Sequence, residues 1–377
     1  MHYLIGGSGI PNYGDELMAR GWLRYLAQHH PEDRVVIDTT LPTVSTLLLQ
    51  PAHWKASHVA IVREVGFPKS SPDFWKNFAR GLAFFDQGGF AAFPQLNLAE
   101  GFLAQANRFH LFGGGYISSK WPNTGFLLGF AGALKARFGT RLHGTGLGLL
   151  PIDPPPAALQ QAFRTVLNGF TSLELRDPAA EGFIRDHSAG DNVVPDGLDD
   201  CFMEPPPPLH DQPPTLHISC FMKDSGLAPL LRRLDRRRER ISKRFEKIKF
   251  WVCAPHRDQD AFEAIRDLFP QTEAAHVGDL LADPGFSKDD VMITSRFHPH
   301  MIAARAGIRG YYIQISGDYY AAKHQSVVAL GSRFLPFADF ETRNFDLEPC
   351  TAMAKADAER VTRKQKRATA IYGGNLT

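Results

Sequence analysis

The sequence contains little of what marks secreted, metal-binding or membrane-spanning proteins. It has four cysteines, Cys201, Cys220, Cys253 and Cys350, and none forms a CxxC pair. This spacing supports neither a disulfide framework nor a zinc site, so we expect small buried core residues in a cytoplasmic protein. No apolar run approaches the ~20 residues of a membrane helix, and the chain enters a strand-like run without a secretory signal.

An excess of charge is also missing. The 42 basic and 40 acidic residues give a formal net charge of +2, which gives no reason to expect nucleic acid as the main partner. One basic run, residues 232–244, stands out. Its apolar residues recur at helical spacing, which predicts a single helix over about 228–246 with a charged, solvent-facing side. Peripheral contact with anionic lipid at the cytoplasmic membrane face is the alternative interpretation.

At 377 residues the chain exceeds one usual hydrophobic core, so we expect two domains. Strand-like and helical runs alternate throughout, which is typical of doubly wound α/β domains. Residues 204–214 carry six prolines, which suit neither core strand nor helix. We therefore predict an N-terminal α/β domain (1–203), a proline-rich linker (204–214) and a C-terminal α/β domain (215–377). A final helix over 354–370 is expected to pack back across the interface. Ligands of such pairs bind near the carboxyl ends of the strands.

The first motif with chemical content follows the first strand candidate, Tyr3–Gly6. Glycines come next, and then the box Asn12-Tyr-Gly14-Asp15-Glu16 opens a helix. Glycines let the backbone approach a ligand, and the helix N-terminus offers N–H donors. Because no third glycine follows at the required spacing, this is not a dinucleotide fingerprint. Asp15 and Glu16 either complement the helix dipole or accept hydrogen bonds from ligand hydroxyls.

The second motif is Ser295-Arg296-Phe-His298, between a strand candidate over 290–294 and a helix over 298–306. Arginine offers a planar fork for carboxylate or phosphate, and histidine can exchange a proton near neutral pH. The alternative is a structural ion pair for Arg296 and a cap contact for His298.

Weaker candidates follow other strands. Gly113–Gly115 and Gly144–Gly148 are expected as loops after strands, where they either approach a ligand or make tight turns. Arg176 repeats the strand-end arginine, with Asp177 as a helix N-cap. His143 is expected to be a hydrogen-bonded core residue, the aromatic stretch 67–93 core or lid, and no metal site is expected around Asp196, Asp199 and Asp200.

Taken in order, these segments resemble the polysaccharide pyruvyl transferase family. The resemblance rests on the Asn12–Glu16 box, the two glycine segments, Arg176-Asp177, Pro195-Asp196, the Ser295–His298 segment and Lys323, between about residues 4 and 331. Phe297 replaces the usual leucine, and residues 67–100 match nothing in the family pattern.

The resemblance implies two Rossmann-like domains of the GT-B glycosyltransferase architecture and transfer of pyruvate from phosphoenolpyruvate to two hydroxyls of a sugar. It needs no cofactor and no metal, and it leaves open whether the acceptor is lipid-linked. His298 is the implied acid, and Asp15 or Glu16 the base or the groups that orient the sugar. The implied substrate-binding residues are Asn12, Gly14, Gly114, Gly115, Gly146, Arg176, Ser295, Arg296 and Lys323.

Two other functions fit the same residues less well. A nucleotide-sugar glycosyltransferase of this architecture would release a nucleoside diphosphate instead of phosphate, since fold alone does not fix function. A non-catalytic sugar-binding protein would not need Arg176, Arg296 and His298 together with two carboxylates.

Overall fold

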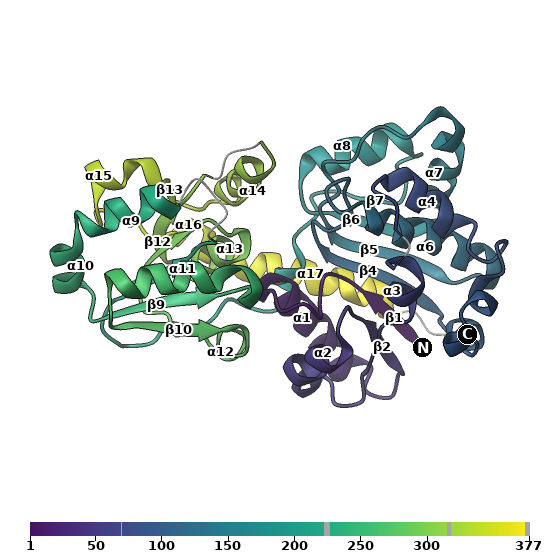
Figure 1. Cartoon of the computed structure of the whole chain (residues 1–377), viewed down its shortest axis with the longest axis horizontal. Helices are drawn as coiled ribbons and strands as arrows, with labels where there is room; N and C mark the ends of the chain where they lie inside the picture. Colours follow the sequence, from purple (N-terminus) through teal and green to yellow (C-terminus); the bar gives the residue numbers. More distant parts are fainter. Residues whose placement is uncertain (69, 222–226, 315–317, 374–377) are drawn as a thin grey trace. The chain divides into compact units, whose positions relative to one another are not determined.

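The computed structural model describes residues 1–68, 70–221, 227–314 and 318–373, and these form two α/β units (Figure 1). The first unit comprises Met1–Ile10, Asp15–Met203 and the chain from Lys364 onward. The second comprises Pro11–Gly14 and Glu204–Arg363. The first unit is therefore assembled from three separate stretches of sequence.

The sheet of the first unit is entirely parallel, with strand order β3-β2-β1-β4-β5-β6-β7. Its strands are β1 (His2–Ile5), β2 (Val35–Asp38), β3 (Ser57–Val59), β4 (Arg108–Gly114), β5 (Arg141–Leu147), β6 (Phe170–Leu175) and β7 (Val193–Val194). Its helices are α1 (Tyr13–His29), α2 (Pro42–Leu49), α3 (Ile61–Gly66), α4 (Phe74–Leu82), α5 (Ala99–Leu103), α6 (Gly125–Phe138), α7 (Ala157–Gly169) and α8 (Pro178–His187). The strand order reverses direction between β1 and β4.

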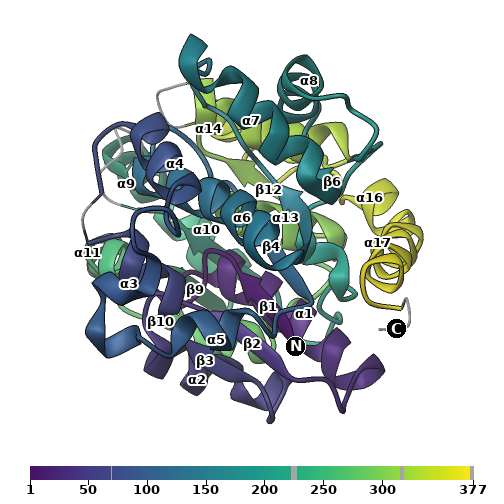
Figure 2. The same cartoon turned by 90° about the vertical axis from the view of Figure 1, so that its right-hand side faces the viewer.

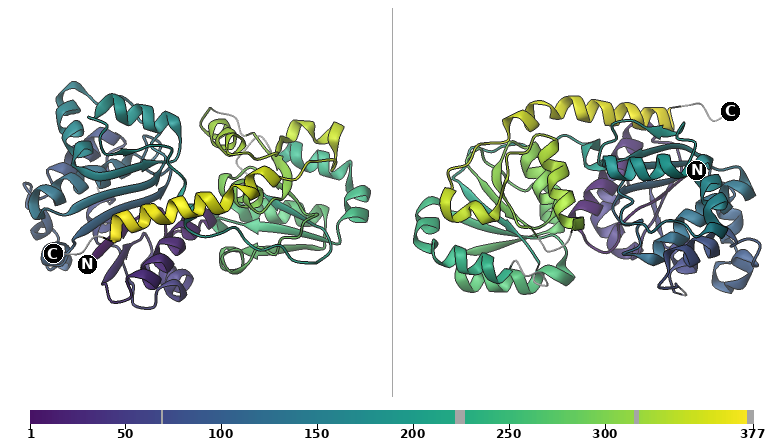
Figure 3. Two further views of the ribbon diagram at one scale, coloured as in Figure 1. Left: turned by 180° about the vertical axis from the view of Figure 1, so that it is seen from behind. Right: turned by 90° about the horizontal axis from the view of Figure 1, so that it is seen from above.

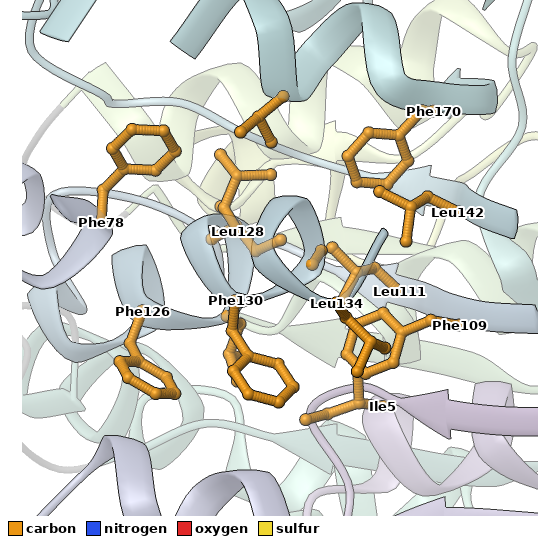
Figure 4. Packing of buried hydrophobic residues seen from close by; sticks show 14 of the residues in the cluster. Ile5, Phe78, Phe109, Leu111, Phe126, Leu128, Phe130, Leu134, Leu142 and Phe170 are labelled. Carbon is orange, nitrogen blue, oxygen red and sulfur yellow. The ribbon is translucent and has the colours of Figure 1, made fainter. Parts of the chain in front are cut away.

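Helices α4, α6 and α7 lie side by side over this sheet (Figure 2). Gly125 and Gly129 of α6 allow the close approach of α4, because a Cβ on either would lie about 2 Å from the carbonyl oxygen of Phe74 or Phe78. The rings of Phe78, Phe84 and Phe90 in the aromatic stretch are buried. Figure 4 shows Phe78 in the same cluster as Leu128 and Phe130 of α6. The aromatic stretch is thus mostly core, as predicted.

The second unit repeats the same topology with strand order β10-β9-β8-β11-β12-β13, again all parallel. Its strands are β8 (Thr215–Ser219), β9 (Lys247–Val252), β10 (Thr272–His276), β11 (Val291–Thr294), β12 (Arg309–Tyr312) and β13 (Leu335–Pro336). Its helices are α9 (Leu227–Asp235), α10 (Arg238–Arg244), α11 (Pro255–Leu268), α12 (Val277–Ala282), α13 (Phe297–Arg305), α14 (Asp318–Ala329), α15 (Phe340–Arg343) and α16 (Thr351–Lys355). Here the order reverses between β8 and β11.

The last helix, α17 (Asp357–Tyr372), contributes to both units and is the long yellow helix in Figure 3. Its first residue, Asp357, accepts a hydrogen bond of 2.6 Å from Arg305 Nε in the second unit. In the first unit, Lys364 Nζ lies 2.5 Å from both Glu174 Oε2 and Asp200 Oδ1. A buried ammonium group between two buried carboxylates fixes this part of the helix to the first sheet.

Three sequence predictions need correction. Gly113 and Gly114, expected in a loop, are the last two residues of β4. The loop expected at Gly144–Gly148 is strand as far as Leu147, with a bulge where Gly146 takes a φ of 57°. The single helix expected over 228–246 is two helices, because Arg237 leaves helical geometry and bonds Asn344 Oδ1 at 2.8 Å.

Candidate functional site

In each sheet, the predicted site residues lie at the point where the strand order reverses. In a doubly wound sheet, this switch point opens the crevice in which ligands bind, at the carboxyl ends of the strands. The first sheet places Gly6–Gly9 after β1 and Gly113–Gly115 at the end of β4. The second sheet places Ser295–His298 directly after β11.

The turn after β11 is held by hydrogen bonds from two of its backbone amides. The Ser295 amide donates to the Ser219 carbonyl at 2.9 Å, and the Arg296 amide donates to Thr294 Oγ1 at 2.9 Å. Arg296 is the residue that precedes α13, and His298 is the second residue of that helix. The turn therefore presents Arg296 and His298 together.

Arg296 pairs with Asp258, an acid that the sequence analysis did not select. Asp258 is fully buried at the start of α11, where its Oδ2 accepts from the Ala254 amide at 2.8 Å. Burial raises the pKa of Asp258, and the Arg296 guanidinium opposes that rise. The Arg296 guanidinium also stacks on the Phe221 ring, 5.0 Å from its centroid. Asp258 is the fourth residue of an otherwise ordinary helix, and nothing in the sequence pattern distinguishes it as a site residue.

Two buried donor groups of this turn have no acceptor among the described residues. They are the Ser295 hydroxyl and Arg296 Nε. Buried polar groups of folded proteins are nearly always hydrogen-bonded to protein, water or ligand. Two such donors at a sheet switch point can hydrogen-bond an anionic or polar ligand.

The tyrosine and glycine of the Asn12–Glu16 box belong to this second unit. The Tyr13 amide donates to the Cys253 carbonyl at 2.8 Å, and the Tyr13 ring meets the Trp251 ring edge-on at 5.5 Å. Gly14 lies flat against the His298 imidazole, since a Cβ on Gly14 would be 1.8 Å from His298 Nδ1. This contact explains why glycine occupies the position and shows that Gly14 sets where the imidazole lies.

The first unit carries the box's acidic residues. Asp15 is partly exposed between the two glycine segments: a Cβ on Gly7 would lie 2.6 Å from its Cγ, and one on Gly114 would lie 3.3 Å from its Oδ1. Any larger residue at Gly7 would therefore displace this carboxylate.

Glu16 is fully buried beside Asp15 and differs from it chemically. Its Oε1 accepts from the Gly9 amide at 2.8 Å, and its Oε2 has no partner among the described residues. Burial raises the pKa of Glu16 to about 8, with a smaller upward effect from Asp15. Glu16 is therefore a neutral carboxylic acid at pH 7.

Arg63 is a second group that the sequence analysis missed. This buried residue of α3 donates to the Gly6 carbonyl, and its Nε lies 3.5 Å from Asp38 Oδ1. Its positive charge lowers the pKa values of both Asp38 and Glu16, against the larger effect of burial. It lies in a short helix after a short strand, where nothing distinguishes it from a surface arginine.

Arg176 follows β6 and is tied to the protein. Its Nη1 donates to Asp199 Oδ2 at 3.0 Å, and a Cβ on Gly148 would lie 2.8 Å from its Nε. Asp177 caps α8 as predicted, since its Oδ1 accepts from the Ala180 amide at 2.8 Å. His143 is likewise a buried, hydrogen-bonded residue, with Nδ1 3.0 Å from Ser172 Oγ.

The predicted site residues thus fall into two groups. The second unit holds Asn12, Gly14, Ser295, Arg296, His298 and, on α14, Lys323. The first unit holds Asp15, Glu16, Gly114, Gly115, Gly146 and Arg176. Within the described chain, no three His, Cys, Asp or Glu side chains are grouped to hold a metal ion. None of the helices searched in that same part is long and apolar enough to cross a membrane.

Comparisons with known proteins give a family and a fold. The family model described as polysaccharide pyruvyl transferase matches residues 12–317, which is most of the chain. No curated protein matches the sequence.

Solved structures similar to this chain include a UDP-N-acetylglucosamine 2-epimerase with a TM-score of 0.57 and 11% identity, over 100% of this chain and 96% of that one. The Neisseria meningitidis UDP-GlcNAc 2-epimerase bound to UDP-GlcNAc has a TM-score of 0.52 and 9% identity, over 97% and 100%. The Methanocaldococcus jannaschii enzyme has a TM-score of 0.51 and 9% identity, over 97% and 99%. At these identities the likeness shows the fold alone. It confirms the predicted class of two Rossmann-like domains of GT-B type.

Proposed function

We propose, from the premise that this chain belongs to the polysaccharide pyruvyl transferase family, that it transfers pyruvate from phosphoenolpyruvate to two hydroxyls of a sugar. The product is a cyclic ketal, and phosphate is released. Membership of the family makes the chain a transferase. The observation that supports this donor is the pair of buried groups without acceptors, Ser295 Oγ and Arg296 Nε, in the turn that also carries His298.

Phosphoenolpyruvate fits this turn chemically. Its carboxylate and phosphate need hydrogen-bond donors and positive charge, which Arg296 and the Ser295 hydroxyl supply. Asp258 binds the guanidinium and so restrains it before the ligand arrives. Lys323 and Arg176 are proposed to add further positive charge for the carboxylate or the departing phosphate.

The reaction requires one proton donor and one proton acceptor. We assign His298 as the acid that protonates the methylene carbon, which leaves an electron-poor C2. The first sugar hydroxyl bonds to C2 and loses its proton to a base. The bond between C2 and the phosphate oxygen then breaks, and the second hydroxyl closes the ketal. One hydroxyl proton replaces the proton given to the methylene carbon, and the other leaves with phosphate.

Asp15 is the better candidate for the base. A base must be ionised and reachable by the acceptor, and Asp15 is partly exposed between two glycine segments. Glu16 is buried and holds its proton at neutral pH, so it suits hydrogen-bond donation instead. No cofactor or metal has a place in this scheme.

The function is tested by product analysis. The protein is incubated with phosphoenolpyruvate and a panel of galactosides, mannosides and N-acetylated sugars, and products are examined by mass spectrometry for a gain of pyruvate minus water. Arg296→Ala and His298→Ala should abolish the product, whereas the control Arg266→Ala, an exposed arginine of α11, should not. Near-normal turnover in both site variants refutes the assignment. Parallel incubations with nucleotide sugars test the glycosyltransferase alternative, which predicts a released nucleoside diphosphate.

We further propose that helices α9 and α10 contact an anionic lipid surface. Residues 232–247 carry nine basic and three acidic side chains, a net charge of +6, whereas the whole chain has +2 and the remainder therefore −4. The apolar residues of these helices, such as Leu234 and Ile241, are buried, so exposed charge dominates the outer side. Basic helices of this kind bind anionic headgroups in a salt-dependent manner.

Cosedimentation with vesicles tests this contact. The protein should bind phosphatidylglycerol vesicles at low salt and not phosphatidylcholine vesicles, and the double variant Arg238→Glu, Arg240→Glu should lose that binding. The control Lys76→Glu, an exposed lysine of the first unit, should retain it. Binding that survives the double variant contradicts the proposal.

A further inference from the structure

A chain of buried hydrogen bonds runs behind the Ser295–His298 turn. His324 Nε2, on α14, lies 3.3 Å from the Ser295 carbonyl oxygen. His324 Nδ1 lies 3.0 Å from His300 Nδ1, and His300 Nε2 lies 2.8 Å from Ser332 Oγ. Both imidazoles are buried, with exposed fractions of 0% and 1%.

The hydrogen bond to the Ser295 carbonyl determines the tautomers of both His324 and His300. A carbonyl oxygen only accepts, so His324 Nε2 carries the proton, and in the neutral ring Nδ1 then accepts. His300 must therefore donate from its Nδ1–H, and its Nε2 accepts from the Ser332 hydroxyl. Burial lowers the pKa of both rings, that of His324 to about 4, so both are neutral at pH 7.

The hydrogen bond from His324 to the Ser295 carbonyl completes the restraint of the turn. The Ser295 amide and the Arg296 amide already have the backbone and Thr294 partners described above. The Ser295 carbonyl is the remaining polar group of the peptide that joins Ser295 to Arg296, and His324 holds it. A peptide plane fixed at both its carbonyl and its amide fixes the direction in which the Arg296 side chain leaves the backbone.

We propose that His324 is a positioning residue: through the Ser295 carbonyl it holds the turn in the orientation that binds the donor. The ligand in this inference rests on the proposed function, whereas the tautomer and the hydrogen bond do not. Because His324 lies on α14, the same contact also joins that helix to the turn.

Two substitutions separate the two hydrogen bonds of His324. In His324→Gln the amide nitrogen reaches the position of Nε2 and can still donate to Ser295. In His324→Asn the amide reaches only the position of Nδ1, which keeps the contact to His300 and loses the one to Ser295. We expect His324→Gln to keep phosphoenolpyruvate affinity and kcat within about threefold of wild type, and His324→Asn to lose about 100-fold in kcat/KM, the scale of a 1 Å misplacement.

Ser332→Ala is the matched control, because it removes a hydrogen bond at the far end of the same chain. It should leave kcat/KM within about threefold, while circular dichroism confirms that all variants are folded. Equal kinetics for the Gln and Asn variants overturns the proposal, as does an equal loss in Ser332→Ala.

Nitrogen-15 NMR of labelled histidine gives an independent readout. With the resonance assigned by its loss in His324→Gln, the shifts should show a proton on Nε2 of His324 and none on Nδ1. The opposite tautomer overturns the inference. If wild type neither binds phosphoenolpyruvate nor transfers pyruvate, the proposed function fails, and the NMR measurement still decides whether His324 donates to Ser295.

Discussion

The substitution Glu16→Gln should make the protein more stable, and increasingly so as the pH rises. Glutamine keeps the shape of the side chain: its oxygen can accept from the Gly9 amide as Glu16 Oε1 does, and its NH2 group takes the place of the protonated oxygen. It differs from glutamate in having no proton to lose. The comparison therefore isolates the free energy of keeping Glu16 protonated in the folded state.

The sign and size follow from the pKa. Burial raises the pKa of Glu16 from 4.5 to about 8, so between these values the folded protein binds a proton that the unfolded chain has lost. The wild-type free energy of unfolding therefore falls as pH rises through this window. At about 1.4 kcal/mol per pH unit, this contribution reaches about 3 kcal/mol by pH 7. The variant lacks it.

Urea unfolding at several pH values between 4.5 and 8 measures the difference. The variant's advantage over wild type should grow by about 2.5 kcal/mol between pH 5 and pH 7, and its growth should slow as the pH approaches 8. Glu64→Gln, which replaces an exposed carboxyl on α3, is the control and should change stability by less than about 0.5 kcal/mol at each pH. A difference that does not depend on pH refutes the argument, because it means that Glu16 is ionised in the folded protein. If Asp15 is the base, the variant should also retain most of its turnover.

Three further predictions concern other parts of the molecule. Gly14→Ala should reduce turnover by about 100-fold or more, because the added Cβ displaces the His298 imidazole; kinetic assays and donor binding measure this loss. The control Gly182→Ala, where a Cβ meets nothing within 4 Å, should leave turnover unchanged. Equal activities of the two variants would contradict the contact between Gly14 and His298. Acid should destabilise the second unit. Burial lowers the pKa of His324 to about 4, so as the pH falls from 6.5 to 4 the unfolded chain binds a proton that the folded protein does not. Thermal unfolding over this range should show stability decreasing as the pH decreases, and His324→Gln should make that decrease smaller. Lys364→Met should destabilise the first unit by about 3–5 kcal/mol in urea unfolding, since it leaves two buried carboxylates uncompensated; a change below about 1 kcal/mol would exclude the ion pairs.

Local sequence signals predicted the elements of this fold and the residues at strand ends. The strand that ends at Thr294 and the helix that contains Pro299 are separated by only two residues, so the sequence alone was enough to place Arg296 at the carboxyl edge of a sheet. The same holds for Asp177, whose capping role needs only the following proline.

Residues that act over long sequence separations could not be predicted in this way. Asp258, His324 and Arg63 lie 38, 29 and 57 positions from the groups that they bond. They lie within helices, and only the strand order brings the partners together. The division of the Asn12–Glu16 box was hidden for the same reason: its Tyr13 finds the Cys253 carbonyl 240 positions away.

The discontinuity of the first unit has a consequence for how the chain is made. Lys364, which neutralises Glu174 and Asp200, is translated after every residue of the second unit. In the usual order, the N-terminal domain folds first during synthesis. In this chain the carboxylates of Glu174 and Asp200 would then lack the Lys364 ammonium group until the ribosome reaches α17. The second unit, whose helices and strands from β8 to α16 emerge earlier, can complete its sheet while the first still lacks its last helix. Helix α17 is thus the last helix in sequence that the first unit receives.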